Sequence, residues 1–171
     1  MLYLPQPQSE KAQLAVGLFR EGMSINSIPF AFLSYFKILN VLSGSGSAQK
    51  NWINNNLSLL WYQPAVDRLN EVRASNRDVG AYLYHQGRCA VAHAFDRDVV
   101  NPDKYEDKKR LELDLPLMKE VAALCIEQGF GVLSDCSFWG HLKKTQVCPP
   151  ELLQKHSDGY GRIIYRQYTD A

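Results

Sequence analysis

The feature that most constrains the fold is a series of segments in which apolar residues recur every three or four positions. That spacing places them on one side of an α-helix. Each segment is bounded by residues that cap or end helices, such as serine, aspartate, glycine and proline. The segments are residues 9–21, 27–42, 48–76 (two short helices around Pro64), 78–95 and 106–128. The sequence therefore predicts an all-α helical bundle of about five to six helices over residues 1–128.

Three polar residues and one proline mark helix boundaries most clearly. Ser9, Ser27 and Asp78 precede periodic segments and can accept hydrogen bonds from the free N–H groups of a first helical turn. Pro116 lies inside the last segment, and proline both lacks an N–H and clashes with the preceding turn. We therefore expect a break near Asp114, with the better helix beginning at the next residue.

Residues 27–42 carry apolar side chains around much of the helix, which predicts that this helix lies at the centre of the core. The side chains are Phe30, Leu33, Phe36, Ile38 and Val41. The Ser-Gly-Ser-Gly-Ser sequence of residues 43–47 predicts a flexible loop. Beyond it, five further apolar residues are expected to pack on the core: Trp52, Ile53, Leu57, Leu60 and Trp61.

The character of the chain changes after residue 128. Glycine and proline punctuate short segments there, and residues 162–168 could form a strand or an extended tail. This pattern predicts an irregular C-terminal extension, residues 129–171, packed on the same domain.

Charge and composition limit the classes of function. A net charge of +1, with 46% apolar and 22% charged residues, is typical of a soluble globular protein without a general attraction to nucleic acid. No apolar run approaches the ~20 residues that span a bilayer, and the first residues lack the features of a signal peptide. We therefore expect a cytoplasmic protein that does not bind membranes. Its four dispersed cysteines should be reduced: Cys89, Cys125, Cys136 and Cys148.

An arginine and a histidine stand out within residues 78–95. Arg88 and His93 are separated by small or apolar residues, in a segment otherwise typical of a buried helix. A guanidinium can bind a phosphate through several donors, and an imidazole can transfer protons near neutral pH. Cleaving RNA without a metal requires a base, an acid and positive charge for the phosphorane. Arg88 could supply the charge, and His93 one of the proton transfers.

The spacing of this pair raises a geometric question. Five residues along an α-helix correspond to about 140° of rotation and about 7.5 Å of rise, so the two side chains do not share one narrow stripe. Arg88 is long enough to bend toward a cleft shared with His93. Alternatively, Gly87 could interrupt the helix and leave Arg88 in a new first turn, where free N–H groups favour an anion. Both routes are physically open.

A purely structural role is the first alternative for the pair. Arg88 could form an ion pair with a carboxylate such as Asp96 or Glu106. His93 could be a hydrogen-bonded residue of the core. A short motif of this kind often arises by chance, so the motif does not decide between these roles.

A zinc site is the second alternative. His85, Cys89 and His93 recur four residues apart, and a fourth ligand could come from His141, Cys136 or Cys148. Three consecutive ligands on one helix fit a tetrahedral ion poorly. We therefore predict no metal and no other cofactor.

Several further residues are weaker candidates for substrate binding. Tyr35 and Lys37 could line the same cleft from residues 27–42. Tyr82 and Tyr84 could stack on bases, as aromatic residues of single-strand binders do. His85 and Cys89 complete the set of candidates because they lie on the same helix as Arg88.

The sequence around the pair, from Ala81-Tyr82-Leu83-Tyr84 to Ala94-Phe95, resembles the core motif of HEPN (higher eukaryotes and prokaryotes nucleotide-binding) domains. The resemblance extends over roughly residues 28–128 and is sharpest at residues 78–95. The chain is similar in particular to a bacterial HEPN-like group that carries a methylamine-utilisation label. That label reflects gene neighbourhood and implies no chemistry.

The resemblance implies a HEPN-like bundle that acts as a metal-independent RNA endonuclease. It implies that Arg88 binds the scissile phosphate, that His93 transfers protons, and that a homodimer forms through the helix that carries them. It also implies a toxin, stress or phage-defence role, with a cognate antitoxin or system partner. Active members commonly have a polar residue directly after the arginine, where this chain has Cys89. The alternative is a catalytically inactive module that dimerises or binds RNA or a nucleotide.

Overall fold

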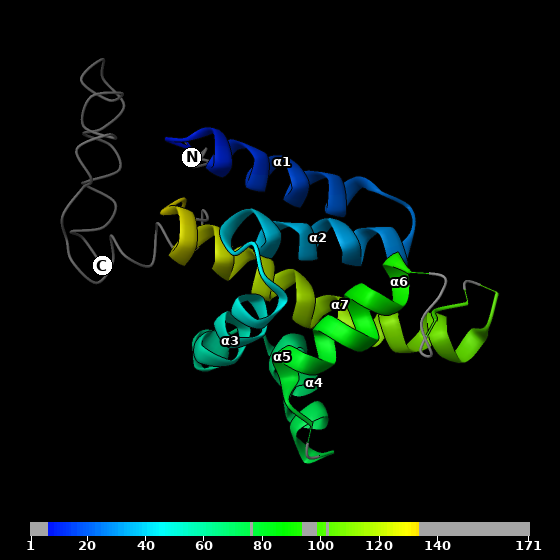
Figure 1. Cartoon of the computed structure of the whole chain (residues 1–171). Helices are drawn as coiled ribbons and strands as arrows, with labels where there is room; N and C mark the ends of the chain where they lie inside the picture. The colour runs from blue at the N-terminus through cyan, green and yellow to red at the C-terminus, as the bar shows by residue number, and fades with distance from the viewer. Residues whose placement is uncertain (1–6, 76, 94–98, 102, 134–171) are drawn as a thin grey trace, which may run out of the picture. The chain divides into compact units, whose positions relative to one another are not determined.

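The computed structural model describes residues 7–75, 77–93, 99–101 and 103–133 (Figure 1). All regular secondary structure in these ranges is helical, which confirms the predicted all-α class. The longer helices are α1 (Glu10–Ser24), α2 (Ile28–Leu42), α3 (Gly46–Asn56), α4 (Gln63–Ala74) and α7 (Tyr105–Leu124). Two short helices are the 3₁₀-helix η1 (Leu57–Leu59) and the π-helix η3 (Cys125–Gly129). One continuous helical run comprises α5 (Val79–Tyr82), the π-helix η2 (Leu83–Cys89) and α6 (Ala90–Ala92), and we call this run the motif helix.

These elements lie in one compact unit, Gln6–Val132. The predicted C-terminal extension begins at the last residue of η3, and residues 134–171 lie outside the described part of the chain. Its packing on the helical domain therefore stays a prediction.

Side-chain caps explain where two of the predicted helices begin. The Ser9 hydroxyl accepts a hydrogen bond from the Ala12 N–H at 3.1 Å and starts α1. The Asp78 carboxylate accepts one from the Ala81 N–H at 2.6 Å and starts the motif helix. Both caps were predicted from the sequence. Ser27 also precedes α2, but there it makes no side-chain cap, and a proline occupies the first turn instead.

Helix α2 lies at the centre of the core, as predicted. It packs against both α1 and α7, and Figure 1 shows it between these two helices. Phe36 and Ile38 are fully buried, as are Phe32 and Leu39. Phe30 departs from the prediction because its side chain is 59% exposed. It lies seven residues before the exposed Lys37, on the outer face of the helix.

No single helix among the described residues is long and apolar enough to cross a membrane. Helix α2 and the segment Gly46–Leu59 pass that test of length and composition only as a pair, and the pair is bent by 101°. Seven of the 15 residues of α2 are buried inside the protein.

The glycine–serine segment is not simply a loop. Its Ser45 hydroxyl accepts a hydrogen bond from the Ala48 N–H at 3.3 Å, so α3 already begins at Gly46. The loop prediction was therefore wrong for its last two residues. Composition suggested flexibility, but a serine followed by helix-compatible residues is also an N-cap.

The connection between α3 and α4 corrects another prediction. The Trp61 side chain is 67% exposed and does not pack in the core, although Ile53 and Leu57 do. The backbone is held instead, because the N–H groups of Trp61 and Tyr62 donate to Oε1 of Glu120 at 2.7 and 2.9 Å. This carboxylate on α7 thus holds the two residues that precede α4, and the indole faces solvent.

Helix α7 passes through Pro116 without the predicted break. Proline leaves the carbonyl of Glu112 without its usual partner, and Glu112 lies on the exposed side of the helix, where water can bind that oxygen. Asp114 and Leu117 on either side of the proline are fully buried. Tertiary packing therefore outweighs the local cost of the proline.

Candidate functional site

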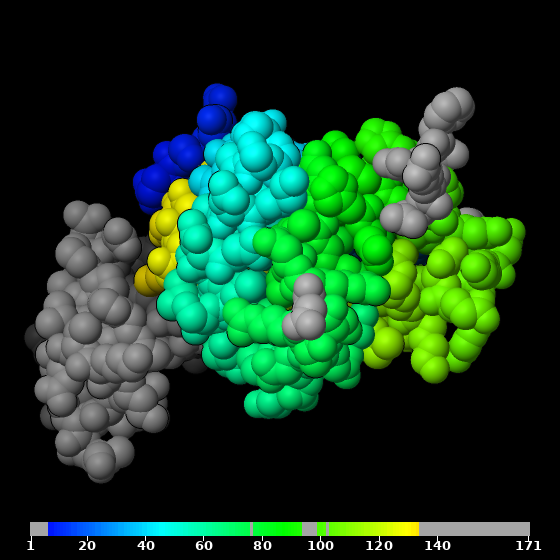
Figure 2. All heavy atoms as spheres, turned by 60° about the horizontal axis from the view of Figure 1, so that its bottom comes forward, coloured from blue at the N-terminus to red at the C-terminus, as the bar shows by residue number. Residues whose placement is uncertain are grey.

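The motif helix is docked on α3 at its first turn. The Asn54 side chain donates to both oxygens of the capping Asp78, at 3.0 and 2.9 Å, and accepts a hydrogen bond from the Gly80 N–H at 2.9 Å. A Cβ atom at Gly80 would overlap the Lys50 carbonyl oxygen, so only glycine permits this approach. Figure 2 shows α3 and the motif helix side by side on one face of the molecule. The start of the motif helix is therefore fixed relative to α3.

The middle of the motif helix is a π-helix, Leu83–Cys89, in which hydrogen bonds span five residues in place of four. Gly87 lies inside it and does not interrupt it, so the predicted route through a new first turn is wrong. A Cβ atom at Gly87 would overlap the ring of Phe32 on α2. The glycine thus serves close packing of two helices. A second contact to another helix comes from Arg110 on α7, whose guanidinium donates to the Gln86 carbonyl within the π-helix at 2.7 Å.

Arg88 and His93 meet at the end of the motif helix. Nη1 of Arg88 lies 3.1 Å from Nε2 of His93. The chain leaves the helix at His93, whose extended backbone (φ −121°, ψ 114°) follows the last residue of α6, Ala92, three residues before the predicted end at position 95. Arginine can only donate, so this contact is a hydrogen bond when Nε2 is the acceptor and Nδ1 carries the proton. The first route, a long arginine bending toward the histidine, agrees with this geometry.

Both side chains of the pair are accessible. His93 is exposed and Arg88 is half-buried, so His93 is not a core histidine. Within the described ranges Arg88 has no carboxylate at ion-pair distance, and Glu106 in particular does not pair with it. Asp96 lies outside these ranges. The structural alternative from the sequence therefore has no support at His93 or at Glu106.

Tyr84 joins this pair to the core. Cζ of Arg88 lies 5.6 Å from the centre of the Tyr84 ring, and Nζ of Lys50 on α3 lies 5.5 Å from it. The edge of the same ring contacts Phe36 of α2, with ring centres 6.0 Å apart. Two cations over one aromatic ring form a cation–π arrangement in which the ring holds both charges. We call Lys50, Tyr84, Arg88 and His93 the Arg88 cluster.

The other residues predicted for the site differ in their burial and in their contacts with the Arg88 cluster. His85 is exposed and contacts the Tyr84 ring, with ring centres 5.0 Å apart. Cys89 is buried, and its Sγ accepts a weak hydrogen bond from Nη1 of Arg88 at 3.6 Å. Lys37 is exposed on α2. Tyr35, predicted to line the cleft, is buried against Phe19 in place of facing the surface.

The zinc alternative finds no site in the part of the chain that the structure describes. No group of three histidine, cysteine, aspartate or glutamate side chains there could hold a metal ion. His141, Cys136 and Cys148 lie outside the described residues. Cys125, like Cys89, is free, and burial raises the pKa of its thiol to about 12.

Sequence reasoning missed a buried polar network around Asp114, which is fully buried on α7. Its carboxylate accepts hydrogen bonds from Nε of Arg68 at 2.9 Å and from the Tyr82 hydroxyl at 2.9 and 3.1 Å. Arg110 forms a longer ion pair with it at 3.5 Å. We call these four residues the Asp114 network. It ties α4, the motif helix and α7 together at one carboxylate.

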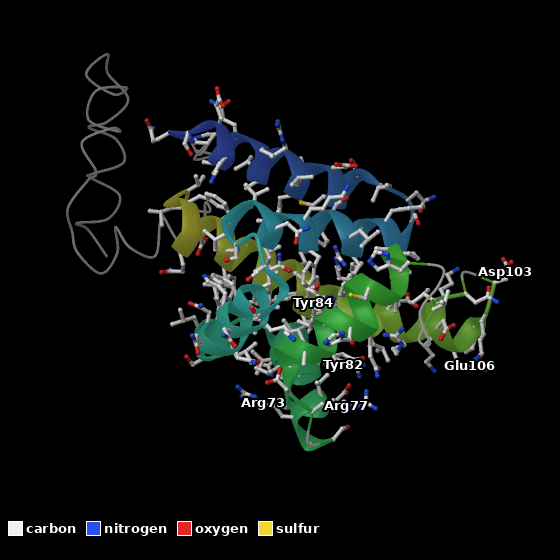
Figure 3. The ribbon with its side chains drawn as sticks, in the orientation of Figure 1. Arg73, Arg77, Tyr82, Tyr84, Asp103 and Glu106 are labelled. Atoms are coloured by element: carbon white, nitrogen blue, oxygen red, sulfur yellow. The ribbon has the colours of Figure 1, made fainter. Side chains whose placement is uncertain are left out.

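Electrostatics in the Asp114 network follow from burial. Burial raises the pKa of Asp114, and the charge of Arg68 opposes that shift. Burial and the neighbouring Asp114 both raise the pKa of Tyr82, which keeps its hydroxyl protonated as a donor. Tyr82 is only 5% exposed, so it cannot stack on a base. Figure 3 shows Tyr84 above Tyr82 on the same helix. The signal for this network was Asp114 itself, an acidic residue three positions from both Leu111 and Leu117 on an apolar stripe.

Comparison with known proteins gives one result. The family model described as "Methylamine utilization protein MauJ" matches residues 15–127, a range that contains both the Arg88 cluster and the Asp114 network. No curated protein and no solved structure matches the chain.

Proposed function

Because the chain belongs to the MauJ family, a HEPN-like family, we propose that it is a metal-independent RNA endonuclease that acts as a homodimer. The observation that carries the proposal is the set of contacts that the Arg88 side chain makes. Its guanidinium touches a histidine and an aromatic ring, and among the described residues no carboxylate pairs with it. An arginine placed in this way at the surface is available to a phosphate.

The chemistry follows from the two side chains. Once the Arg88 guanidinium has turned from Nε2 of His93 to the phosphate, the unprotonated Nε2 accepts the proton of a ribose 2′-hydroxyl, and O2′ then attacks the neighbouring phosphorus. Arg88 donates to the non-bridging oxygens as negative charge builds on the phosphorane. The bond from phosphorus to O5′ breaks, and O5′ takes a proton from an acid. The products are a 2′,3′-cyclic phosphate and a 5′-hydroxyl, and no metal enters the reaction.

A homodimer supplies the missing acid. Among the described residues His93 is the histidine that contacts Arg88, and a single imidazole cannot act as base and acid at the same moment. A two-fold axis beside the motif helix would bring the His93 and Arg88 of a second copy to the same phosphate. One imidazole would then act as the base and the other, protonated, as the acid.

A second candidate function is an inactive module that dimerises or binds RNA or a nucleotide. The observation that favours it is Cys89, whose sulfur is the side-chain partner of Arg88 beside His93. Sulfur is a weak acceptor, so it orients a guanidinium less firmly than an amide oxygen would. In this case the same cluster would bind phosphate without cleaving it. A toxin, stress or defence setting with an antitoxin partner belongs to the first candidate.

The test is incubation of the purified protein with RNA in EDTA. We expect cleavage by the wild type, and a loss of at least about 100-fold in rate for both Arg88→Ala and His93→Ala. The melting temperature should stay nearly unchanged, because both residues are at least partly exposed. Arg20→Ala is the matched control, an exposed arginine on α1 whose loss should leave the rate unaltered.

Two further readouts complete this test. Sedimentation should give a dimer, and mass spectrometry of the products should show 2′,3′-cyclic phosphate ends. A folded dimer that leaves RNA intact would contradict the enzyme and support the inactive module.

A further inference from the structure

Lys50 is presented to the Arg88 cluster by a closely docked helix. The Asn54 side chain, one turn after Lys50 on α3, joins Asp78 and the Gly80 N–H by three hydrogen bonds. Two glycines remove obstacles to this docking. A Cβ atom at Gly80 would overlap the Lys50 carbonyl, and one at Gly46 would lie 2.5 Å from the Tyr84 hydroxyl. The backbone of Lys50 is thus held against the motif helix.

The docking leaves two positive charges on one ring. Nζ of Lys50 and Cζ of Arg88 lie 5.5 and 5.6 Å from the centre of the Tyr84 ring. Their separation is therefore no greater than the sum of these distances. Within the described ranges neither cation lies at ion-pair distance from a carboxylate, although the charge of Lys50 contributes to lowering the pKa of Asp78, which itself bonds to Asn54 and the Ala81 N–H. An anionic ligand beside the Tyr84 ring would be attracted by both charges.

From this arrangement we infer that Lys50 forms a second phosphate subsite, which binds the phosphate next to the scissile one in single-stranded RNA. The inference rests on the proposed function, in which Arg88 takes the scissile phosphate. Tyr84 acts here as a positioning residue. Its ring already contacts two cations and orients them, so it does not stack on a base. The ligand class is a single strand with at least two consecutive phosphates.

Salt dependence of binding tests the subsite without using cleavage. The binding of a labelled oligouridine of about eight nucleotides would be measured at several salt concentrations. The protein would carry His93→Ala, so that the RNA stays intact. Each phosphate neutralised in a single strand contributes about 0.7 to the slope of log K against log salt. We expect Lys50→Gln to reduce the slope by about 0.7 and Lys50→Arg to restore it, whereas Lys11→Gln, at an exposed lysine of α1, should not change it.

Cleavage gives a second measurement, which would not distinguish the two substrates below if Lys50 had only a structural role. In a chain with His93 intact, Lys50→Gln should lower kcat/KM for an oligouridine. It should leave kcat/KM unchanged for a dinucleoside monophosphate, which contains only the scissile phosphate. Equal losses on both substrates would overturn the subsite.

The two proposals fail in different ways. An unchanged slope in Lys50→Gln, with cleavage by the wild type, would overturn the subsite alone. A slope reduced by about 0.7 without cleavage by the wild type would support the subsite and contradict the nuclease. Absence of any salt-dependent binding of RNA would overturn both.

Discussion

Two arginines of this protein, Arg68 and Arg88, have opposite surroundings. Arg68 on α4 donates to the fully buried Asp114 at 2.9 Å, to Glu71 at 2.7 Å and to the Tyr82 hydroxyl at 3.1 Å. Arg88 on the motif helix contacts a histidine nitrogen, a sulfur and an aromatic ring. The charge of the first guanidinium is balanced by carboxylates, whereas among the described residues no carboxylate pairs with the second.

The motif helix therefore carries side chains of two kinds, those that stabilise the fold and those of the candidate site. Tyr82 and Tyr84 lie two residues apart, and they belong to the Asp114 network and the Arg88 cluster respectively. The network secures the motif helix against α4 and α7 through a buried carboxylate. The cluster lies at the surface, where a ligand can displace water from it. Substitutions in the two groups should therefore have different consequences.

The largest effect on stability is expected for Asp114→Ala. The substitution leaves the Arg68 guanidinium and the Tyr82 hydroxyl without their common acceptor. Loss of one partner of a buried ion pair costs about 3 kcal/mol or more in the free energy of unfolding. Urea denaturation would measure it, with Glu112→Ala as control at an exposed acid on the same helix. Equal stability of the two variants would contradict the role given to the network.

An intermediate effect, about 1 kcal/mol at neutral pH, is expected for Asp78→Ala, which removes the cap of the motif helix. The hydrogen bond from the Ala81 N–H, followed by that from Asn54, holds the pKa of Asp78 below its ordinary value of 3.8. A lowered pKa means that the stabilising effect of the carboxylate is complete above pH 3.8 and is lost as the pH falls through the lowered pKa.

This pH dependence can be measured from urea midpoints at several pH values. The difference between wild type and Asp78→Ala should shrink in acid. Asp78→Asn keeps a capping oxygen and does not titrate, so it should retain more stability and lack this acid-dependent loss. A difference that is constant from neutral to acidic pH would contradict the assignment.

The smallest effect on stability is expected for Arg88→Ala. Its loss removes a cation–π contact at a partly exposed site, worth about 0.5–1 kcal/mol in the free energy of unfolding. Arg68→Ala, measured beside it by urea denaturation, should be clearly more destabilising because Asp114 would lose its closest guanidinium. If Arg88→Ala were the more destabilising of the two, the arginine would be structural and the contrast between the two regions would fail.

The sequence predicts the helices well where local signals act. Ser9 and Asp78 cap helices by bonds to the third residue that follows, so nearby residues contain the whole signal. Pro116 and Trp61 were misjudged because distant contacts decide their places. The proline is tolerated between side chains buried by other helices, and Glu120 holds the backbone of Trp61 from α7.

The site shows the same division. The sequence identifies Arg88 and His93 as a pair, but it does not say how a helix brings them together. Within the π-helix Gly87 packs against Phe32 and the Gln86 carbonyl accepts a hydrogen bond from Arg110, and both partners come from other helices. Likewise, nothing local to Lys50 indicates the Tyr84 ring, and although Arg110 precedes Asp114 by four residues on the same helix, Arg68 comes from α4.

The π-helix also affects how this chain can change in length. It contains more residues per turn than an α-helix, so it behaves as an insertion that the fold has kept within a helix. Deleting one residue from Leu83–Cys89 and restoring α-helical winding would remove the wide turn, so the residues that follow would keep nearly the same direction relative to the Asp78 end. An insertion absorbed in this way leaves the two ends of the motif helix in place. A relative that is one residue shorter here and purely α-helical would therefore keep the orientation of the helix end that carries His93.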